Sequence, residues 1–349
     1  MYYRKKNPHG GAAWEAGVTL DLSANTNPLG TPPGVLEAVR ASLSRVRDYP
    51  DPYCRDLVNA IARFEAVPPE YVLCGNGAAE LIYAWAAAAQ PKTAAETAPT
   101  FSEYSEALEK QGCRMERYPL RQEKDFLPDE GFLDFVAEKR PEAVCLCTPN
   151  NPTGRLIPRK LLERVLDLCA SLGTRLFLDE CFLALSDGGV SLKSRLAEYP
   201  GLFILKAYTK SYGMAGLRLG YCLTADAALL ERMGEAGQPW NVSVPAQAAG
   251  IAALEEGAFL KRALEVIRTE KPRLKAGLEA LGYWVCPSEA NYLLFQGPED
   301  LGERLLSRGI ALRSCANYHG LGPGWYRTAV RTRAENEILL HELEGMGEH

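Results

Sequence analysis

The sequence predicts an α/β fold, in which a mostly parallel β-sheet lies between helices. Short apolar runs at 144–147 and 175–178 have the length and composition of strands that are buried on both faces of such a sheet. Segments with apolar residues at helical spacing alternate with these runs, which is the order of right-handed β-α-β units. The 349 residues, 47% of them apolar, can fill one large core or two of ordinary size.

The predicted elements follow one another in a regular order. Helices are expected at 34–46, 54–65, 78–89, 102–111 and 158–171, and strands at 71–74, 93–97, 114–118, 144–147, 175–178, 201–205 and 219–222. The composition changes near 238–241, and residues 246–281 are predicted to be mostly helical, with a kink or break at Pro272. Strand-like segments at 283–286, 292–295, 311–313 and 326–331 then alternate with helices that end at Glu344.

This order of elements predicts two domains. A large domain over 28–241 would hold the mostly parallel sheet between its helices. A smaller α+β domain would be formed by 242–349 together with 1–27, because the N-terminal segment is too short to fold alone and is expected to pack there or against a partner.

Composition and charge exclude several classes of protein. The chain has 39 Lys and Arg against 44 Asp and Glu, a net charge of −5, whereas nucleic acids and anionic lipids select basic surfaces. Its longest apolar run, 81–89, is less than half of the roughly 20 residues that span a bilayer, and its N-terminus lacks the apolar segment of a secretory signal. The ten cysteines form no C-x-x-C motif, and only four histidines accompany them. We therefore expect a cytoplasmic protein with reduced thiols, no metal site, and no nucleic-acid or membrane partner.

Two loops that follow predicted strands are suited to bind a ligand. Gly75-Asn76-Gly77 lies between a strand and a helix, where glycines allow backbone N–H groups to point at a phosphate, although an ordinary tight turn has the same pattern. Thr148-Pro149-Asn150-Asn151-Pro152-Thr153-Gly154 directly follows the strand 144–147. That position is the carboxyl edge of the sheet, where α/β folds bind ligands, but Asn-Pro is also common in turns.

Charged side chains follow two further strands. Asp179-Glu180 ends an apolar run, and magnesium binding, structural capping and catalysis all remain open for such an acidic pair. Thr209-Lys210 follows the strand 201–205, and the segment Gly216-Leu217-Arg218-Leu219-Gly220 comes shortly after it. A single lysine is usually a solvated surface group. In this context Lys210 is a candidate Schiff-base amine with a phosphate-binding Arg218 beside it.

Taken in order, these segments resemble the class I/II aminotransferase superfamily, the fold type I enzymes that depend on pyridoxal 5′-phosphate (PLP). The resemblance covers nearly the whole chain. It implies that Lys210 bonds covalently to PLP and that Asp179 pairs with the protonated pyridine nitrogen. The other contacts it implies are Asn151 to the ring hydroxyl, Phe101 on the ring face, and Asn76, Gly77, Ala78, Thr209, Arg218 and Tyr49 to the phosphate. The tyrosine would reach PLP across the interface of a homodimer.

Within the superfamily, the chain resembles the L-threonine O-3-phosphate decarboxylases, which are related to the histidinol-phosphate aminotransferases. The similar segments are His9-Gly10-Gly11, 23–30, 147–154, 239–242, 290–294 and 313–318. The resemblance implies decarboxylation of L-threonine O-3-phosphate to (R)-1-amino-2-propanol O-2-phosphate for cobalamin biosynthesis. It also implies that Arg313, Arg327 and His9 bind the phosphate and carboxylate of this small substrate, in an order the sequence leaves open.

Two alternatives to this function stay open at the level of sequence. An aminotransferase that acts on histidinol phosphate or a related amino acid would share every PLP contact. A non-catalytic PLP-binding module is the other alternative, and the intact pair of Lys210 and Asp179 argues against it.

Overall fold

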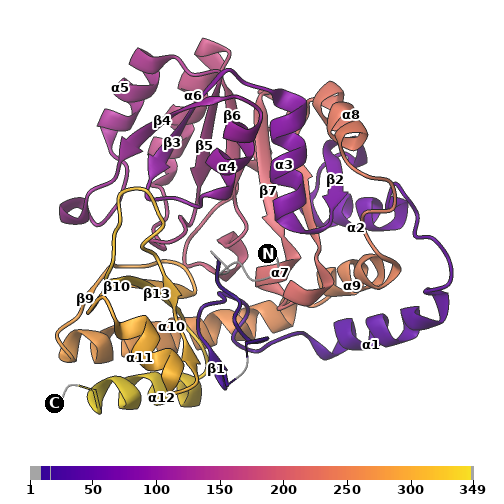
Figure 1. Cartoon of the computed structure of the whole chain (residues 1–349). Coiled ribbons are helices and arrows are strands. Elements are labelled where there is room, and N and C mark those ends of the chain that lie inside the picture. Colours follow the sequence, from indigo (N-terminus) through magenta and orange to yellow (C-terminus); the bar gives the residue numbers. More distant parts are fainter. Residues whose placement is uncertain (1–8, 16, 347–349) are drawn as a thin grey trace.

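A seven-stranded and a four-stranded β-sheet, with a further two-stranded sheet, organise the chain in the computed structural model, which describes residues 9–15 and 17–346 (Figure 1). The helices are α1 (Pro33–Ser42), α2 (Arg55–Glu65), α3 (Gly77–Ala89), α4 (Glu103–Lys110), α5 (Glu130–Lys139), α6 (Arg159–Leu172), α7 (Tyr208–Ser211), α8 (Ala227–Ala236), α9 (Val244–Leu254), α10 (Gly257–Ala280), α11 (Leu301–Ser307) and α12 (Arg333–Glu344). The strands are β1 (Leu20–Asp21), β2 (Val72–Gly75), β3 (Thr93–Ala98), β4 (Arg114–Pro119), β5 (Ala143–Cys147), β6 (Arg175–Asp179), β7 (Leu202–Ala207), β8 (Gly220–Leu223), β9 (Trp284–Val285), β10 (Tyr292–Gln296), β11 (Ile310–Ala311), β12 (Arg313–Ser314) and β13 (Trp325–Ala329).

The larger sheet has seven strands in the order β2-β8-β7-β6-β5-β3-β4. Strand β8 is antiparallel to both of its neighbours, and the other pairs are parallel. Because two antiparallel steps restore the direction, β2 points the same way as β7. The predicted α/β fold with a mostly parallel sheet is therefore confirmed.

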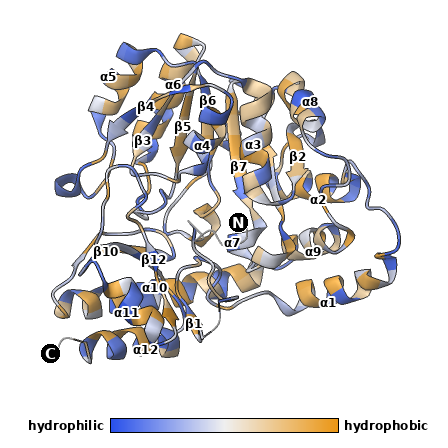
Figure 2. Ribbon diagram, viewed as in Figure 1, coloured by the Kyte–Doolittle hydropathy of each residue, from blue (hydrophilic) through white to orange (hydrophobic). Residues whose placement is uncertain are grey.

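Both faces of this sheet are buried, and the side chains of its strands alternate between two cores. On β6, Leu176 and Leu178 pack among residues of α2, α5, α6 and α9, whereas Phe177 packs among residues of α3, α4 and α8. On β7, Ile204 belongs to the same core as Leu176 and Leu178, and Phe203 to the same core as Phe177. The middle residues of the central strands β5, β6 and β7 are hydrophobic (Figure 2), as expected for strands covered on both faces, whereas charged residues lie near the ends of β6 and β7.

The smaller sheet has four strands in the order β12-β13-β10-β9, and all of its pairs are antiparallel. A third core, formed by residues of β10, β13, α10, α11 and α12, covers one face of it. Strand β1 pairs with β11, so the N-terminal segment lies beside the C-terminal part of the chain (Figure 1). The division into 28–241 and 1–27 with 242–349 stays a prediction; α9, which follows residue 241, packs against α1 and α2.

Three features differ from the sequence prediction. Helices α5 and α8 were not predicted; Asp129 and Asp226 cap their N-termini by accepting hydrogen bonds from the N–H groups of Gly131 and Leu229. The predicted break at Pro272 is wrong, because α10 continues through this residue. The helical region is interrupted instead at residues 255–256, between α9 and α10. Buried side chains on both sides of Pro272 hold the helix against the core, which outweighs the hydrogen bond that proline cannot donate.

Two further properties concern the chain as a whole. Among residues 9–15 and 17–346, no helix combines the length and the apolar character needed to cross a membrane. The ten cysteines are all buried and free of disulfides. Burial raises the pKa of several thiols, to about 12 for Cys169, so they are poor nucleophiles.

Replacing Gly220 with Ala should destabilise the protein. A Cβ atom there would lie 2.8 Å from the Ala78 nitrogen and 3.0 Å from the Gly77 carbonyl carbon, and backbone atoms cannot move aside as a flexible side chain can. We expect the free energy of unfolding, measured by urea denaturation, to fall by about 1–3 kcal/mol. Gly216→Ala is the matched control, because in the described chain a Cβ at Gly216 meets open space. Equal stability of the two variants would contradict the prediction.

Candidate active site

The register of the large sheet brings most of the predicted site residues to one edge. Cys147, which precedes the loop with Asn151, pairs with Asp179 on the neighbouring strand. Further along the sheet, Gly220 pairs with Ala207 on one side and with Gly75 on the other. The carboxyl ends of β2, β5, β6 and β7 and the amino end of β8 therefore meet at the edge where α/β sheets bind ligands.

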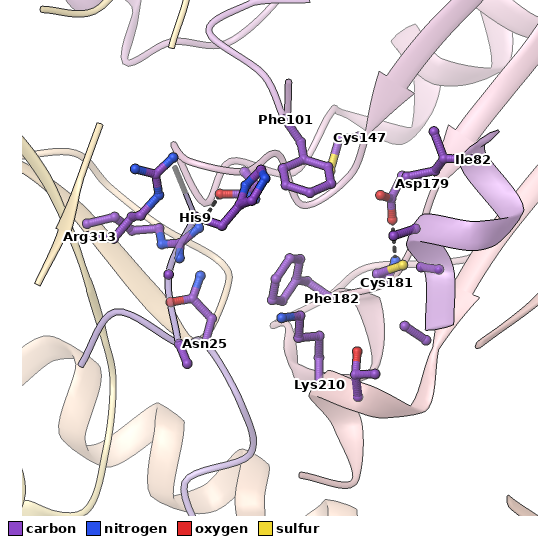
Figure 3. A pocket seen from close by; sticks show the side chains of 18 of the residues that line it. His9, Asn25, Ile82, Phe101, Cys147, Asp179, Cys181, Phe182, Lys210 and Arg313 are labelled. Atoms are coloured by element: carbon purple, nitrogen blue, oxygen red, sulfur yellow. Dashed lines mark hydrogen bonds between the residues drawn. The ribbon is translucent and has the colours of Figure 1, made fainter. Parts of the chain in front are cut away.

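A cavity opens at this edge, between the two sheets (Figure 3). The predicted residues that line it are His9, Ala78, Phe101, Asn151, Asp179, Thr209, Lys210, Arg218, Arg313 and Arg327. In the view of Figure 3, Arg313 and His9 lie across the cavity from Asp179. Gly77 lies directly behind the lining, against the side chain of Arg218. The cavity thus collects basic side chains from the edge of the large sheet and from the small sheet, and among residues 9–15 and 17–346 its one lining carboxylate is that of Asp179.

Lys210 lies on the short helix α7, just after β7. Its Nζ atom is 5.7 Å from the centre of the Phe182 ring. Burial lowers the pKa of Lys210 to about 8, and the positive charges of Arg327 and Arg218 add to this effect. A considerable fraction of this amine is therefore neutral near pH 8, which is the form that reacts with a carbonyl carbon.

Asp179 ends β6 with its carboxylate inside the cavity. One oxygen accepts a hydrogen bond from the backbone N–H of Cys181 at 2.8 Å, and the other accepts one from the Tyr104 hydroxyl at 2.5 Å. Burial raises the pKa of Asp179, while these hydrogen bonds oppose the rise. The carboxylate is therefore fixed in orientation, and a cationic group beside it would offset the energetic cost of burying its negative charge.

The turn between β2 and α3 forms a cup at the start of a helix. Gly77 has φ of +80°, and a Cβ atom there would lie 2.5 Å from Nη2 of Arg218, so only glycine allows the guanidinium to lie against the turn. The N–H of Asn76 donates to the Glu80 carboxylate at 2.6 Å, and the same carboxylate oxygen accepts from the side chain of Asn241. A helix N-terminus with an adjacent arginine is suited to a phosphate.

The two predicted substrate arginines are neighbours on the small sheet. Arg313 on β12 pairs with Arg327 on β13, and both are buried. Arg327 donates hydrogen bonds to the side chain of Asn151 and to the carbonyl oxygen of Ser23. Arg313 donates to the side chain of Asn317 at 2.9 Å. Among the described residues, Nε of Arg327 is buried without a hydrogen-bond partner, which leaves one donor for a ligand.

The remaining predicted residues have contrasting positions. His9 lies at the cavity with Nε2 3.0 Å from a Glu103 oxygen. Tyr49 lies outside the cavity, and 78% of its surface is exposed. Its ring centre is 4.7 Å from that of Trp240. Within one chain, therefore, Tyr49 does not meet the other residues of the site.

Asn25 and Tyr104 are among the cavity residues that were not predicted. Asn25 is 1% exposed and lines the cavity, and neither its amide nitrogen nor its oxygen has a partner in the described chain, so it is suited to contact a ligand. It lies in the segment 23–30, to which the sequence assigned no role. Tyr104, which orients Asp179, comes three residues after Phe101, at a spacing that places both on one side of a helical turn.

The chemistry of this cavity fits PLP. The aldehyde of PLP reacts with an amine that is neutral part of the time. Its pyridine nitrogen is kept protonated by a buried carboxylate, and its phosphate binds to basic side chains and backbone N–H groups. Lys210, Asp179 and the turn at Gly77 with Arg218 match these three needs. The small sheet then adds Arg313 and Arg327, which leaves basic groups for a second, anionic ligand.

Comparisons with known proteins agree with this chemistry. A family profile described as "Aminotransferase class I and II" matches residues 18–343. A threonine-phosphate decarboxylase of Salmonella typhimurium is 38% identical over 352 residues, which cover 97% of this chain and 96% of that protein. A histidinol-phosphate aminotransferase of Desulfitobacterium hafniense is 33% identical over 331 residues, 92% and 90% of the two chains. The crystal structure of the histidinol-phosphate aminotransferase from Clostridium acetobutylicum has a TM-score of 0.87 at 27% identity and covers 94% of this chain and 99% of that one.

Replacing Lys210 with Met should stabilise the cofactor-free protein in a pH-dependent way. The pKa of this buried amine falls from 10.5 to about 8 on folding, so the unfolded chain binds more protons than the folded one between these values. Wild-type stability therefore rises with pH across this window, and below it the buried charge costs about 3 kcal/mol.

We expect Lys210→Met to raise the free energy of unfolding by about 3 kcal/mol at pH 7, and by much less at pH 10. Urea denaturation of cofactor-free protein at both pH values measures the difference. Lys160→Met, at an exposed lysine of α6, is the control and should show no such pH dependence. A gain for Lys210→Met that is the same at both pH values would refute the argument.

Proposed function

The chain belongs to the class I and II aminotransferase family of PLP-dependent enzymes, and from that premise we propose that it decarboxylates L-threonine O-3-phosphate. The observation that carries this proposal is the likeness to a threonine-phosphate decarboxylase along nearly the whole chain. The product would be (R)-1-amino-2-propanol O-2-phosphate, and the resemblance noted in the sequence suggests a place in cobalamin biosynthesis.

In this proposal, the edge of the large sheet holds PLP. Bound PLP supplies an electron sink for the electron pair that remains when a bond to the substrate Cα breaks. Lys210 would hold PLP covalently, and Asp179, oriented by Tyr104, would keep the pyridine nitrogen protonated. The remaining contacts would come from Asn151 and Phe101 at the ring, and from Gly77, Ala78, Thr209 and Arg218 at the phosphate. Asn76, which the sequence also assigns to the phosphate, would bind it only if its N–H exchanged Glu80 for the phosphate.

The residues of the small sheet would determine which substrate bond breaks. Only a bond held perpendicular to the PLP ring overlaps its π system, so the protein chooses the reaction by how it holds the substrate. Arg313, Arg327 and His9 would bind the substrate phosphate and carboxylate and so set the Cα–carboxylate bond upright. Asn25 would contact one of these anions through its unpartnered amide. Lys210 Nζ, once released, would deliver a proton to Cα.

A second candidate function has an observation in its favour. Several relatives at 32–34% identity are named histidinol-phosphate aminotransferase. Such an enzyme would use the same residues for PLP and would set the Cα–H bond upright instead. It would also require a keto acid as the acceptor of the amino group, which a decarboxylase does not need. This requirement distinguishes the two functions.

We also propose that the protein acts in the cytoplasm as a homodimer. In the single chain, the exposed rings of Tyr49 and Trp240 pack against each other at a tilt, away from the cavity. The family resemblance assigns this tyrosine to the phosphate of a partner's PLP. The proposed dimer would cover the two rings and complete the phosphate site with Tyr49.

The direct test of the proposed function is the release of CO₂ from L-threonine O-3-phosphate by the PLP-loaded protein without any keto acid. We expect sustained release over many turnovers. The control reaction contains histidinol phosphate and 2-oxoglutarate, and it should yield no amino transfer. Amino transfer there, without CO₂ release from the first substrate, would establish the aminotransferase instead.

The role of Lys210 has its own test. Lys210→Ala should lose the covalent chromophore, so that borohydride reduction followed by denaturation leaves no PLP on the chain, and CO₂ release should fall by at least about a thousandfold. Lys160→Ala, an exposed lysine on α6, should keep both properties. Covalent PLP on the Lys210→Ala protein would mean that another amine holds the cofactor.

A further inference from the structure

A contact between His9 and Glu103 at the cavity links the N-terminal segment to helix α4. His9 Nε2 lies 3.0 Å from Oε1 of Glu103, which belongs to the first turn of α4. The other carboxylate oxygen accepts a hydrogen bond from the Tyr83 hydroxyl at 2.9 Å, and that hydroxyl accepts one from Lys110 at 3.0 Å. Both oxygens of Glu103 are therefore engaged, and its side chain is only 11% exposed.

The residues that follow His9 contact Ser23, which in turn is hydrogen-bonded to Arg327 of the small sheet. Gly10 packs against the carbonyl oxygen of Ser23, which also accepts a hydrogen bond from Arg327 at 2.7 Å. The N–H of Gly11 donates to the Ser23 hydroxyl at 2.8 Å. His9 thus lies between the arginine pair of the small sheet and helix α4, and its ring centre is 6.3 Å from that of Phe101 at the cavity wall.

Glu103 is suited to hold His9 in this place. It lies between Phe101, which lines the cavity, and Tyr104, which orients Asp179, so its backbone belongs to the rigid wall of the site. A carboxylate in the first turn of a helix is stabilised by the helix dipole. The hydrogen bond from His9 is the main reason that the pKa of Glu103 is lowered, and Tyr83 adds to it.

We propose that Glu103 is a positioning residue for substrate recognition, which holds His9 at the cavity so that the imidazolium binds the phosphate of the amino-acid substrate. A protonated imidazole has two N–H donors, so it can bind a carboxylate and a phosphate at the same time. Glu103 itself does not line the cavity and touches the substrate only through His9. This inference rests on the proposed function, in which His9 contacts a substrate anion.

The test is Glu103→Gln, which keeps the shape and the hydrogen-bond acceptor but removes the charge. We expect KM for L-threonine O-3-phosphate to rise about tenfold, with kcat within twofold of wild type. The dissociation constant from the absorbance change of bound PLP should rise equally, and the one for L-threonine, which lacks the phosphate, should not change. Glu106→Gln is the matched control, because Glu106 lies on the same helix and is exposed.

A double variant separates positioning from a general structural effect. If Glu103 acts through His9, then His9→Gln with Glu103→Gln should bind the phosphorylated substrate no more weakly than His9→Gln alone. The inference is overturned if Glu103→Gln leaves the binding of L-threonine O-3-phosphate unchanged, if it weakens L-threonine equally, or if the two substitutions act additively. Should the wild type release no CO₂, the proposed function fails, while the absorbance titrations still decide the role of Glu103.

Discussion

The buried amine of Lys210 is the constraint on which the rest of the structure depends. An amine whose pKa is about 8 must be removed from water and kept near other positive charges, and both conditions need a well-packed surrounding. The large sheet meets the first condition, because helices cover both of its faces and Lys210 is buried at its carboxyl edge. Arg218, just before β8, and Arg327, on β13 of the small sheet, meet the second. The reactivity of one side chain is thus a property of the whole fold.

The second sheet has a different task from the first. The edge of the large sheet presents Asp179, Lys210 and the cup at Gly77 in positions that strand register fixes. The small sheet presents Arg313 and Arg327 on adjacent strands, and the N-terminal segment closes the gap through Ser23 and His9. In the proposed function, cofactor chemistry and substrate selection therefore come mainly from different sheets, and Arg327 connects the two through its hydrogen bond to Asn151 and its effect on the pKa of Lys210. This separation explains how relatives with different reactions share a fold.

Much of this arrangement could be predicted from the sequence, because its signals are local. A buried strand followed by Asp179, or by Thr209-Lys210, shows both the element and the edge at which the side chain lies. What the sequence could not show depends on contacts between distant segments. Tyr104 reaches Asp179 across 75 positions of the chain, and the pairing of Arg313 with Arg327 needs the register of two strands. The predicted break at Pro272 was wrong because proline usually interrupts a helix, whereas here the packing of α10 against the core outweighs that local effect.

The charges of the cavity suggest why substrate and cofactor belong together here. Lys210, Arg218, Arg313 and Arg327 line it, against the single lining carboxylate of Asp179. Basic groups gathered in a confined, partly dry space repel one another, and anions relieve this repulsion. A phosphate bound at the turn of Gly77 would neutralise Arg218 there. The described acceptors of Arg313 and Arg327 are all uncharged: the side chains of Asn151 and Asn317 and the carbonyl oxygens of Ser23 and Ser314. A substrate with two anionic groups would neutralise the positive charges of Arg313 and Arg327, which the cofactor does not pair. A substrate with only one anionic group would leave one of these buried charges unpaired. Charge balance is thus a physical reason why the proposed phosphorylated substrate suits this site.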